Sequence, residues 1–135
     1  KDCETTFGKE YEFIILDYLK SLGYKVEKMS QNYPYDILVN DYIKVDSKVS
    51  NLYSCSNGKF YSFAIGKKYL TCDIYIFACI NELNGFKYYI IPACVISKHK
   101  QVSIGEYCSK YDKYINKWDY IQQFDTYYQH IMKEA

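Results

Sequence analysis

An acid and an amine lie two residues apart in the segment YIKVDSKV, as Asp46 and Lys48. The segment is rich in branched residues, which favour a β-strand. Side chains on a strand alternate between two faces, so Asp46 and Lys48 share one side while Val45 and its odd-numbered neighbours take the other. A strand at this position therefore holds a carboxylate and an amine side by side.

A second acid, Asp36, begins the preceding segment DILVN, which meets YIKVDSKV at Asn40 and Asp41. Asn-Asp is a two-residue hairpin signal, although a weaker one than Asn-Gly. A hairpin would bring the Asp36 carboxylate toward that of Asp46, and two converging carboxylates repel each other unless a cation lies between them. Mg²⁺ prefers such hard oxygen ligands and keeps several of its waters. An activated water beside Lys48 could then attack a phosphodiester.

The elements that must position these residues begin with an amphipathic helix over residues 9–22, where apolar side chains recur every three or four positions. Thr5 or Thr6 is a candidate N-cap, and Gly23 stands where a left-handed residue would end the helix. Residues 24–29 alternate as a short strand would. The chain thus predicts helix, strand and then the hairpin that carries both acids.

Beyond the hairpin, the polar residues 50–59 predict a mobile connection, and FYSFAIG predicts another strand at an edge of the sheet. DIYIFACI and FKYYIIPACVI are the most apolar runs and predict strands buried on both faces. Residues 118–131 place apolar side chains at helical spacing. This order predicts one α/β domain, residues 1–135, with a central mixed β-sheet flanked by helices.

The ordered set of acids resembles the signature of the PD-(D/E)XK nucleases, which have the restriction-endonuclease-like fold. The matching positions are Gly8, Glu12, Leu19 and Gly23 in the first helix, then Tyr35-Asp36, then Asp46-Ser47-Lys48 across the hairpin. The runs CDIYIFACI and YYIIP are similar to the paired strands of small endonucleases in that family, including intron-encoded homing enzymes. Archaeal junction resolvases share the helix pattern. Pro34 stands one position farther from the acid than in the family's Pro-Asp pair, and the branch stays open.

The resemblance implies a Mg²⁺-dependent DNA endonuclease that hydrolyses phosphodiester bonds, with Mn²⁺ as a substitute ion. It implies Glu12, Asp36 and Asp46 as metal ligands and Lys48 as the residue that positions or polarises the attacking water. Glu10 competes with Glu12 for the part of the helix acid. One chain supplies one site, so cutting both strands of a duplex predicts a homo-oligomer of two or more copies.

The net charge of +1 gives no strongly basic footprint, which counts mildly against nucleic-acid binding. The lysines nevertheless cluster along the chain, so a local basic face is compatible with the composition. The residues predicted to contact DNA are Asn51, Lys59, Lys67, Lys68, Lys98 and Lys100. Bases and aromatics also interleave over residues 98–118, where a solvated charge run is an equally good interpretation.

The six Cys include no Cys-x-x-Cys pair, which argues against a zinc site. Cys79 and Cys94 lie in apolar runs and are predicted to be small buried hydrophobes in a reducing cytosol. No run approaches the roughly 20 apolar residues that a membrane helix needs, and no signal peptide is visible. The expectation is a cytoplasmic protein without a membrane partner. The 18 Tyr fit a core as well as a wet surface.

Simpler interpretations remain beside this one. Asp36 could have a purely structural role, at the start of a strand or as the cap of a turn. Asp46 and Lys48 could form an ion pair on a solvated face, without a function. The chain could keep a nuclease-like fold without catalysis and serve as a nucleic-acid-binding or protein-interaction module. A plain structural α/β protein, with these acids pointing apart, is the third alternative.

Overall fold

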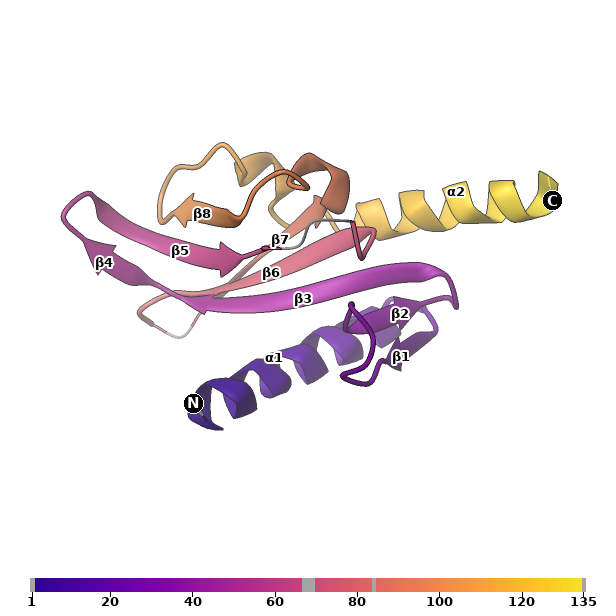
Figure 1. The fold of residues 1–135 in the computed structure, drawn as a ribbon, viewed down its shortest axis with the longest axis horizontal. Coiled ribbons are helices and arrows are strands. Elements are labelled where there is room, and N and C mark those ends of the chain that lie inside the picture. The colour runs from indigo at the N-terminus through magenta and orange to yellow at the C-terminus, as the bar shows by residue number, and fades with distance from the viewer. Residues whose placement is uncertain (1, 67–69, 84, 135) are drawn as a thin grey trace.

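The computed structural model describes residues 2–66, 70–83 and 85–134. The helices are α1 (Asp2–Ser21) and α2 (Asp119–Glu134), with short 3₁₀ turns η1 (Ala93–Val95) and η2 (Asp112–Tyr114). The strands are β1 (Val26–Lys28), β2 (Ile37–Val39), β3 (Ile43–Asn51), β4 (Tyr53–Cys55), β5 (Gly58–Ala64), β6 (Ile74–Ile80), β7 (Phe86–Pro92) and β8 (Gln101–Gly105). Figure 1 shows α2 reaching away from the sheets toward the C-terminus.

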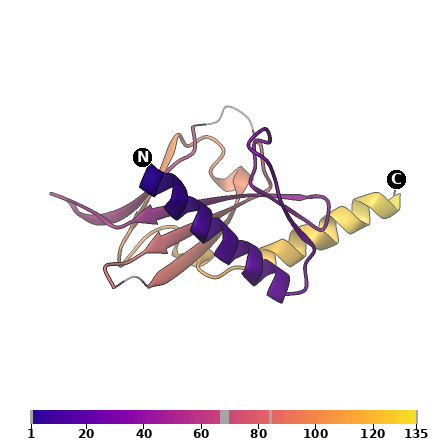
Figure 2. The ribbon, with the colours of Figure 1, turned by 90° about the horizontal axis from the view of Figure 1, so that it is seen from below.

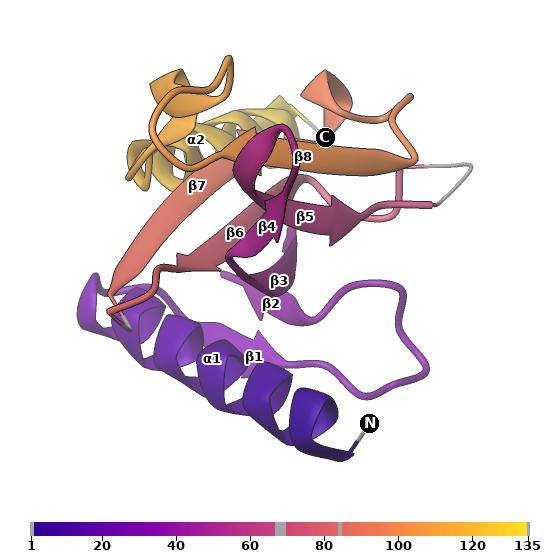
Figure 3. The ribbon, with the colours of Figure 1, turned by 90° about the vertical axis from the view of Figure 1, so that its left-hand side faces the viewer.

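The strands form two sheets. The larger has the order β1-β2-β3-β6-β7, and the smaller has the order β4-β5-β8. Every neighbouring pair is antiparallel except β3 and β6, which run parallel, so the larger sheet is mixed. The smaller sheet and α1 lie on opposite sides of the larger one (Figures 1 and 3).

A separate hydrophobic core packs against each face of the larger sheet. On the α1 side, Ile15, Leu16 and Leu19 of the helix pack with alternate residues of β2, β3 and β6 such as Ile43. This helix crosses the sheet obliquely (Figure 2). On the other side, β5 and β8 cover an aromatic layer in which Phe63 stacks on Phe77 with ring centroids 4.2 Å apart.

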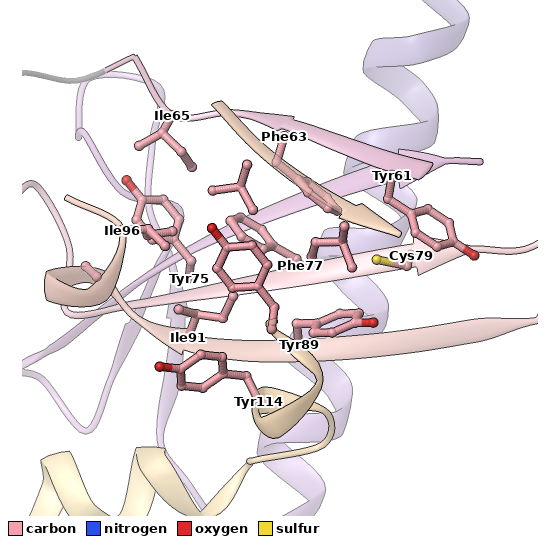
Figure 4. Close-up of a cluster of buried hydrophobic side chains, with 14 of the residues drawn as sticks. Tyr61, Phe63, Ile65, Tyr75, Phe77, Cys79, Tyr89, Ile91, Ile96 and Tyr114 are labelled. Carbon is pink, nitrogen blue, oxygen red and sulfur yellow. The ribbon is translucent and has the colours of Figure 1, made fainter. Parts of the chain in front are cut away.

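Several of the 18 Tyr belong to this aromatic layer (Figure 4). Tyr61, Tyr75 and Tyr89 are almost fully buried there, and burial raises the pKa of each hydroxyl. Tyr33 and Tyr107, by contrast, are exposed. Tyrosine therefore serves both of the environments that composition left open.

The end of α1 confirms the predicted glycine cap. Gly23 has a φ of +96°, in the region that side chains disfavour. Its N–H donates to the Lys20 carbonyl at 3.0 Å, and the Tyr24 N–H donates to the Leu19 carbonyl at 3.3 Å. These two bonds form a Schellman motif. The start differs from the prediction, because the helical backbone already includes Thr5 and Thr6, which therefore cannot be its N-cap.

The predicted β2–β3 hairpin is present. Asn40 and Asp41 both have positive φ, 53° and 70°, as a type I′ turn requires. The Tyr42 N–H closes the turn on the Val39 carbonyl at 3.2 Å. Val39 pairs with Ile43, so the loop has one more residue than the two expected.

Three sequence predictions downstream of β3 are wrong. Residues 50–59 form the end of β3, all of β4 and the start of β5, because Ser56 and Asn57 form the turn of a second hairpin; they are not a mobile connection. β5 is the central strand of its sheet, because β8 pairs with its other side. β8 forms over residues 101–105, for which the sequence pattern predicted no strand. Cys94 is exposed on η1 rather than buried, whereas Cys79 is buried as predicted.

Within the described residues, no helix combines the length and apolarity needed to cross a membrane. Cys55, Cys72, Cys79, Cys94 and Cys108 are all free thiols.

Candidate active site

Asp36 is fixed at the start of β2 by backbone pairing on both sides. Its N–H donates to the Val45 carbonyl at 3.0 Å, and its carbonyl accepts a bond from the Met29 N–H at 2.8 Å. The residue thus lies between the end of β1 and the middle of β3. Pairing of this kind leaves little freedom for the backbone, so the direction of the carboxylate is set by the sheet.

The Asp36 carboxylate reaches β3 next to Asp46. Its Oδ2 accepts a hydrogen bond from the Ser47 N–H at 2.9 Å and a longer one from Ser47 Oγ at 3.3 Å. Together with the Val45 bond, this gives Asp36 contacts with both neighbours of Asp46. The structure therefore brings the two acids to adjacent positions across the hairpin. Sequence reasoning missed Ser47, whose only signal was a hydrogen-bonding side chain inside the Asp-x-Lys triplet.

Asp46 and Lys48 share one face of β3, as strand alternation predicts. Lys48 Nζ lies 3.8 Å from Asp46 Oδ2, and the two side chains are 27% and 6% exposed. A carboxylate buried this far is costly to ionise unless charged or polar neighbours compensate it. This pair therefore differs from the exposed surface ion pairs that contribute little.

The surroundings of Asp46 are aromatic. Tyr75 of β6 lies directly opposite Asp46 in the register, and Phe77 lies opposite Lys48. Burial raises the pKa of Tyr75, and the neighbouring Cys72 and Asp46 raise it further. The Tyr75 hydroxyl therefore stays protonated at neutral pH and can act only as a neutral group beside the carboxylate.

Glu12 approaches Asp36 from the α1 side. Both residues line a cavity of about 580 Å³. Its other lining residues are Lys28, Met29, Ser30, Gln31 and Tyr33. Glu12 is half-buried, whereas Glu10, the competing helix acid, is exposed. Sequence reasoning missed Lys28 and Tyr33, although both are close in sequence to the Tyr35-Asp36 pair.

The donor set suits a hard cation held by few protein ligands. In the described part of the chain, no three His, Cys, Asp or Glu side chains are grouped closely enough to hold a metal ion by themselves. Mg²⁺ is usually bound by only one or two carboxylates, with waters and substrate phosphates completing its shell. Asp36 and Asp46 lie at adjacent positions across the hairpin and suit that pattern, and their role as ligands, like that of Glu12, stays a prediction.

Of the described residues predicted to contact DNA, Asn51 ends β3 of the larger sheet, Lys59 lies near the start of β5, and Lys98 and Lys100 precede β8. Asn51, Lys59, Lys98 and Lys100 are all exposed, and Lys67 and Lys68 lie outside the described residues. Lys59 forms an ion pair with Glu82, which follows β6. The Lys100 carbonyl accepts bonds from the Ile65 and Gly66 N–H groups, just past the far end of β5. Lys59 and Lys100 therefore lie toward opposite ends of β5.

No protein-family model matches the chain, and no curated protein matches it either. Among solved structures, the chain is similar to that of a bacterial homing endonuclease, I-Ssp6803I, with a TM-score of 0.70. The match covers 97% of each chain at 15% sequence identity. Likeness at this identity establishes the fold. The predicted α/β class, with a central mixed sheet flanked by helices, is thus confirmed, and the fold is homing-endonuclease-like.

Proposed function

We propose that this protein is a Mg²⁺-dependent DNA endonuclease of the PD-(D/E)XK type, which hydrolyses phosphodiester bonds. The observation that carries the proposal is the contact of Asp36 with both neighbours of Asp46, while Lys48 lies 3.8 Å from Asp46 on the same face. The fold shared with a homing endonuclease over 97% of the chain supports it.

In this proposal Asp36 and Asp46 hold the cation, which Mn²⁺ can replace, and Glu12 completes or orients the site from the cavity it shares with Asp36. When bound, Mg²⁺ supplies a Lewis acid that activates water and offsets the charge developing on the phosphate. Ser47 keeps the Asp36 carboxylate turned toward β3. These residues therefore fix the direction from which a phosphate can approach.

Lys48 supplies the positive charge of the site. Its side chain is only 27% exposed, and a charge acts more strongly on a substrate where water is partly excluded. The Nζ group can donate hydrogen bonds to a non-bridging phosphate oxygen and to the attacking water. Asp46 keeps the ammonium in place before substrate binds.

A second candidate function is a nuclease-like module that binds DNA or a protein without cutting. The absence of a three-residue metal-binding group among the described residues favours it. This alternative predicts DNA binding that is indifferent to divalent ions and to Asp46. The endonuclease predicts a divalent-ion site that weakens when Asp46 is neutralised, so calorimetric titration with Mn²⁺ of the wild type and Asp46→Asn separates the two.

The cleavage experiment compares the nicking of supercoiled plasmid in Mg²⁺, Mn²⁺ and EDTA. Asp46→Asn and Lys48→Ala are expected to lose about 100-fold or more in rate, as EDTA-treated wild type should. The controls are Lys44→Gln, an exposed amine on the same strand, and Asp17→Asn, an exposed acid on α1. Wild-type rates from Asp46→Asn would refute the proposal. Native mass measurement tests the expected oligomer, which cutting of both strands by single sites requires.

A further inference from the structure

The β4–β5 hairpin is a projection. Its tip extends beyond the rest of both sheets at the end opposite α2 in two perpendicular views (Figures 1 and 2). Tyr53 pairs with Phe60, Ser54 with Lys59 and Cys55 with Gly58, and every residue from 53 to 59 is exposed. The hairpin is thus ordered by backbone pairing and its turn, not by burial of side chains.

A projecting strand edge is a liability that proteins usually shorten, cover or charge. Here the exposed segment carries side chains with groups that can donate or accept hydrogen bonds, in the order Tyr53, Ser54, Cys55, Ser56, Asn57 and Lys59. It contains no aliphatic residue that a hydrophobic partner would cover. A polar, adaptable surface of this kind suits a partner that offers many donors and acceptors.

The charge of the surrounding segment points to an anionic partner. No Asp or Glu occurs between Asp46 and Asp73, and that stretch contains four Lys. The whole chain has 16 Asp and Glu against a net charge of only +1, so the acids are concentrated elsewhere. Two acids nevertheless lie beside Lys59: Glu82 forms an exposed ion pair with it, and the Glu106 N–H donates to the Lys59 carbonyl at 3.2 Å.

We propose that the β4–β5 hairpin enters the major groove of duplex DNA and contacts base edges there, with Ser54, Asn57 and Lys59 as the contacting residues. This inference rests on the endonuclease proposed above. The major groove admits a two-stranded β-ribbon, and it displays a different donor and acceptor pattern for each base pair. Asn pairs well with adenine and Lys with guanine in that groove. Ser54 and Lys59 lie opposite each other on one face of the ribbon, with Asn57 at its turn.

The distance from the site predicts where this recognition occurs. β3 runs without interruption from Asp46 to Asn51, and β4 follows after one residue. Asn57 lies 11 residues beyond Asp46 in the sequence (57 − 46), and at roughly 3.3 Å per residue the tip lies at most about 36 Å away. One turn of B-DNA rises about 34–36 Å. The hairpin therefore contacts base pairs up to about one turn from the scissile phosphate.

The test measures binding, so it does not depend on cleavage. Asp46→Asn is used to select bound molecules from a 40-base-pair duplex library with a randomised centre, in Ca²⁺. The same selection is run with three further variants, in which Ser54→Ala, Asn57→Ala or Lys59→Ala is added singly to Asp46→Asn. The charge-matched control adds Lys20→Ala, which changes an exposed lysine of α1. Thermal unfolding of each variant verifies folding.

The hairpin variants are expected to lose base preference at a cluster of positions, while the Lys20→Ala control keeps it. Wild-type cleavage of a selected duplex then places the cut up to about ten base pairs from that cluster. Unchanged preferences in all three hairpin variants would overturn the proposal, and so would a selection that enriches no sequence. A change of native mass with unchanged DNA preference would make the hairpin a self-association element and overturn it too. A wild type that selects duplexes but cuts none contradicts the endonuclease, not the hairpin's role.

Discussion

The hydrogen bonds of Asp36 allow its structural and chemical roles to be separated by two substitutions. Asp36→Ala removes the acceptor of both Ser47 bonds and leaves the Ser47 N–H without that partner. Hydrogen bonds to charged groups are worth about 1.5–3 kcal/mol, so unfolding free energy should fall by about that amount. Asp36→Asn keeps an amide oxygen in the same place, and only the charge-assisted part is lost, about 1 kcal/mol.

These free energies convert into melting temperatures. Unfolding entropy of about 2.1 cal/mol/K per residue means that 1 kcal/mol shifts the Tm of a chain of this length by roughly 3.5 °C. Asp36→Asn should therefore melt about 3–4 °C below the wild type and Asp36→Ala about 5–10 °C below it. Plasmid nicking well below both melting temperatures should fall about 100-fold or more in either variant, because both remove the carboxylate charge.

Differential scanning calorimetry and nicking in Mg²⁺ measure the two quantities on the same samples. Ser47→Ala is the matched control, since it removes the 3.3 Å hydroxyl bond but keeps the 2.9 Å backbone bond. It should keep most of the activity. Wild-type nicking by Asp36→Asn would reduce Asp36 to a strand-pairing residue. An Asn variant as destabilised as the Ala variant would show that the hydrogen-bond reasoning is wrong.

Two further predictions concern stability. Burial raises the pKa of Cys79 and Tyr128 to about 12, and it also raises the pKa of Tyr75 and Tyr89. The unfolded chain ionises these groups near their ordinary values, about 8.5 for Cys and 10 for Tyr. The contribution of these protonated groups to folding stability is thus complete below about pH 8.5 and is lost as pH rises toward 12. The urea midpoint of unfolding should therefore fall over that range. A midpoint that stays constant to about pH 11 would contradict this prediction. Asp125→Ala should cost about 2–4 kcal/mol, because this buried carboxylate accepts bonds from Asn40, Tyr42 and Gln129, whereas Asp119→Ala on the same helix should change the urea midpoint little.

The parts of the fold that sequence reasoning predicted correctly are local ones. Asp36, the turn at Asn40 and Asp41, and the alternation that pairs Asp46 with Lys48 all fall within 13 residues (48 − 36 + 1). A turn signal and a strand period are enough to relate such residues. The same holds for α1, whose apolar spacing and Gly23 cap are visible without tertiary information.

The smaller sheet was missed because its pairing is not local. β5 and β8 are joined by pairs such as Ser62 with Ser103, about 40 positions apart, and each strand alone is short. The turn formers around Asn57 were interpreted as a loop, although Ser56 and Asn57 form a two-residue turn that Gly58 follows as the first residue of β5. Composition alone does not distinguish a loop from a hairpin when the strand before the turn buries no side chains.

The position of Glu12 relative to Asp36 depends on how α1 crosses the sheet, which no spacing rule determines. Burial of Ile15, Leu16 and Leu19 against the sheet determines the position of the helix, and Glu12 lies about one helical turn before these residues. The cavity between helix and loop, and with it Lys28 and Tyr33, is a consequence of that packing. Tertiary placement therefore decides the half of the site that lies outside the hairpin.

Net charge does not describe the local charge of this surface, because it averages over the chain. The acid-free stretch after Asp46 includes most of β3 and both strands of the projecting hairpin. β3 also joins the two proposed activities physically, since it carries Asp46 and Lys48 near its middle and leads directly into β4. The Ser62 N–H of β5 donates to Ser50 Oγ of β3 at 3.0 Å, which ties the second hairpin strand to the same element. Because one continuous strand links them, the proposed cutting site and the proposed recognition hairpin have a fixed spacing, and a flexible linker inserted at this point should remove that spacing.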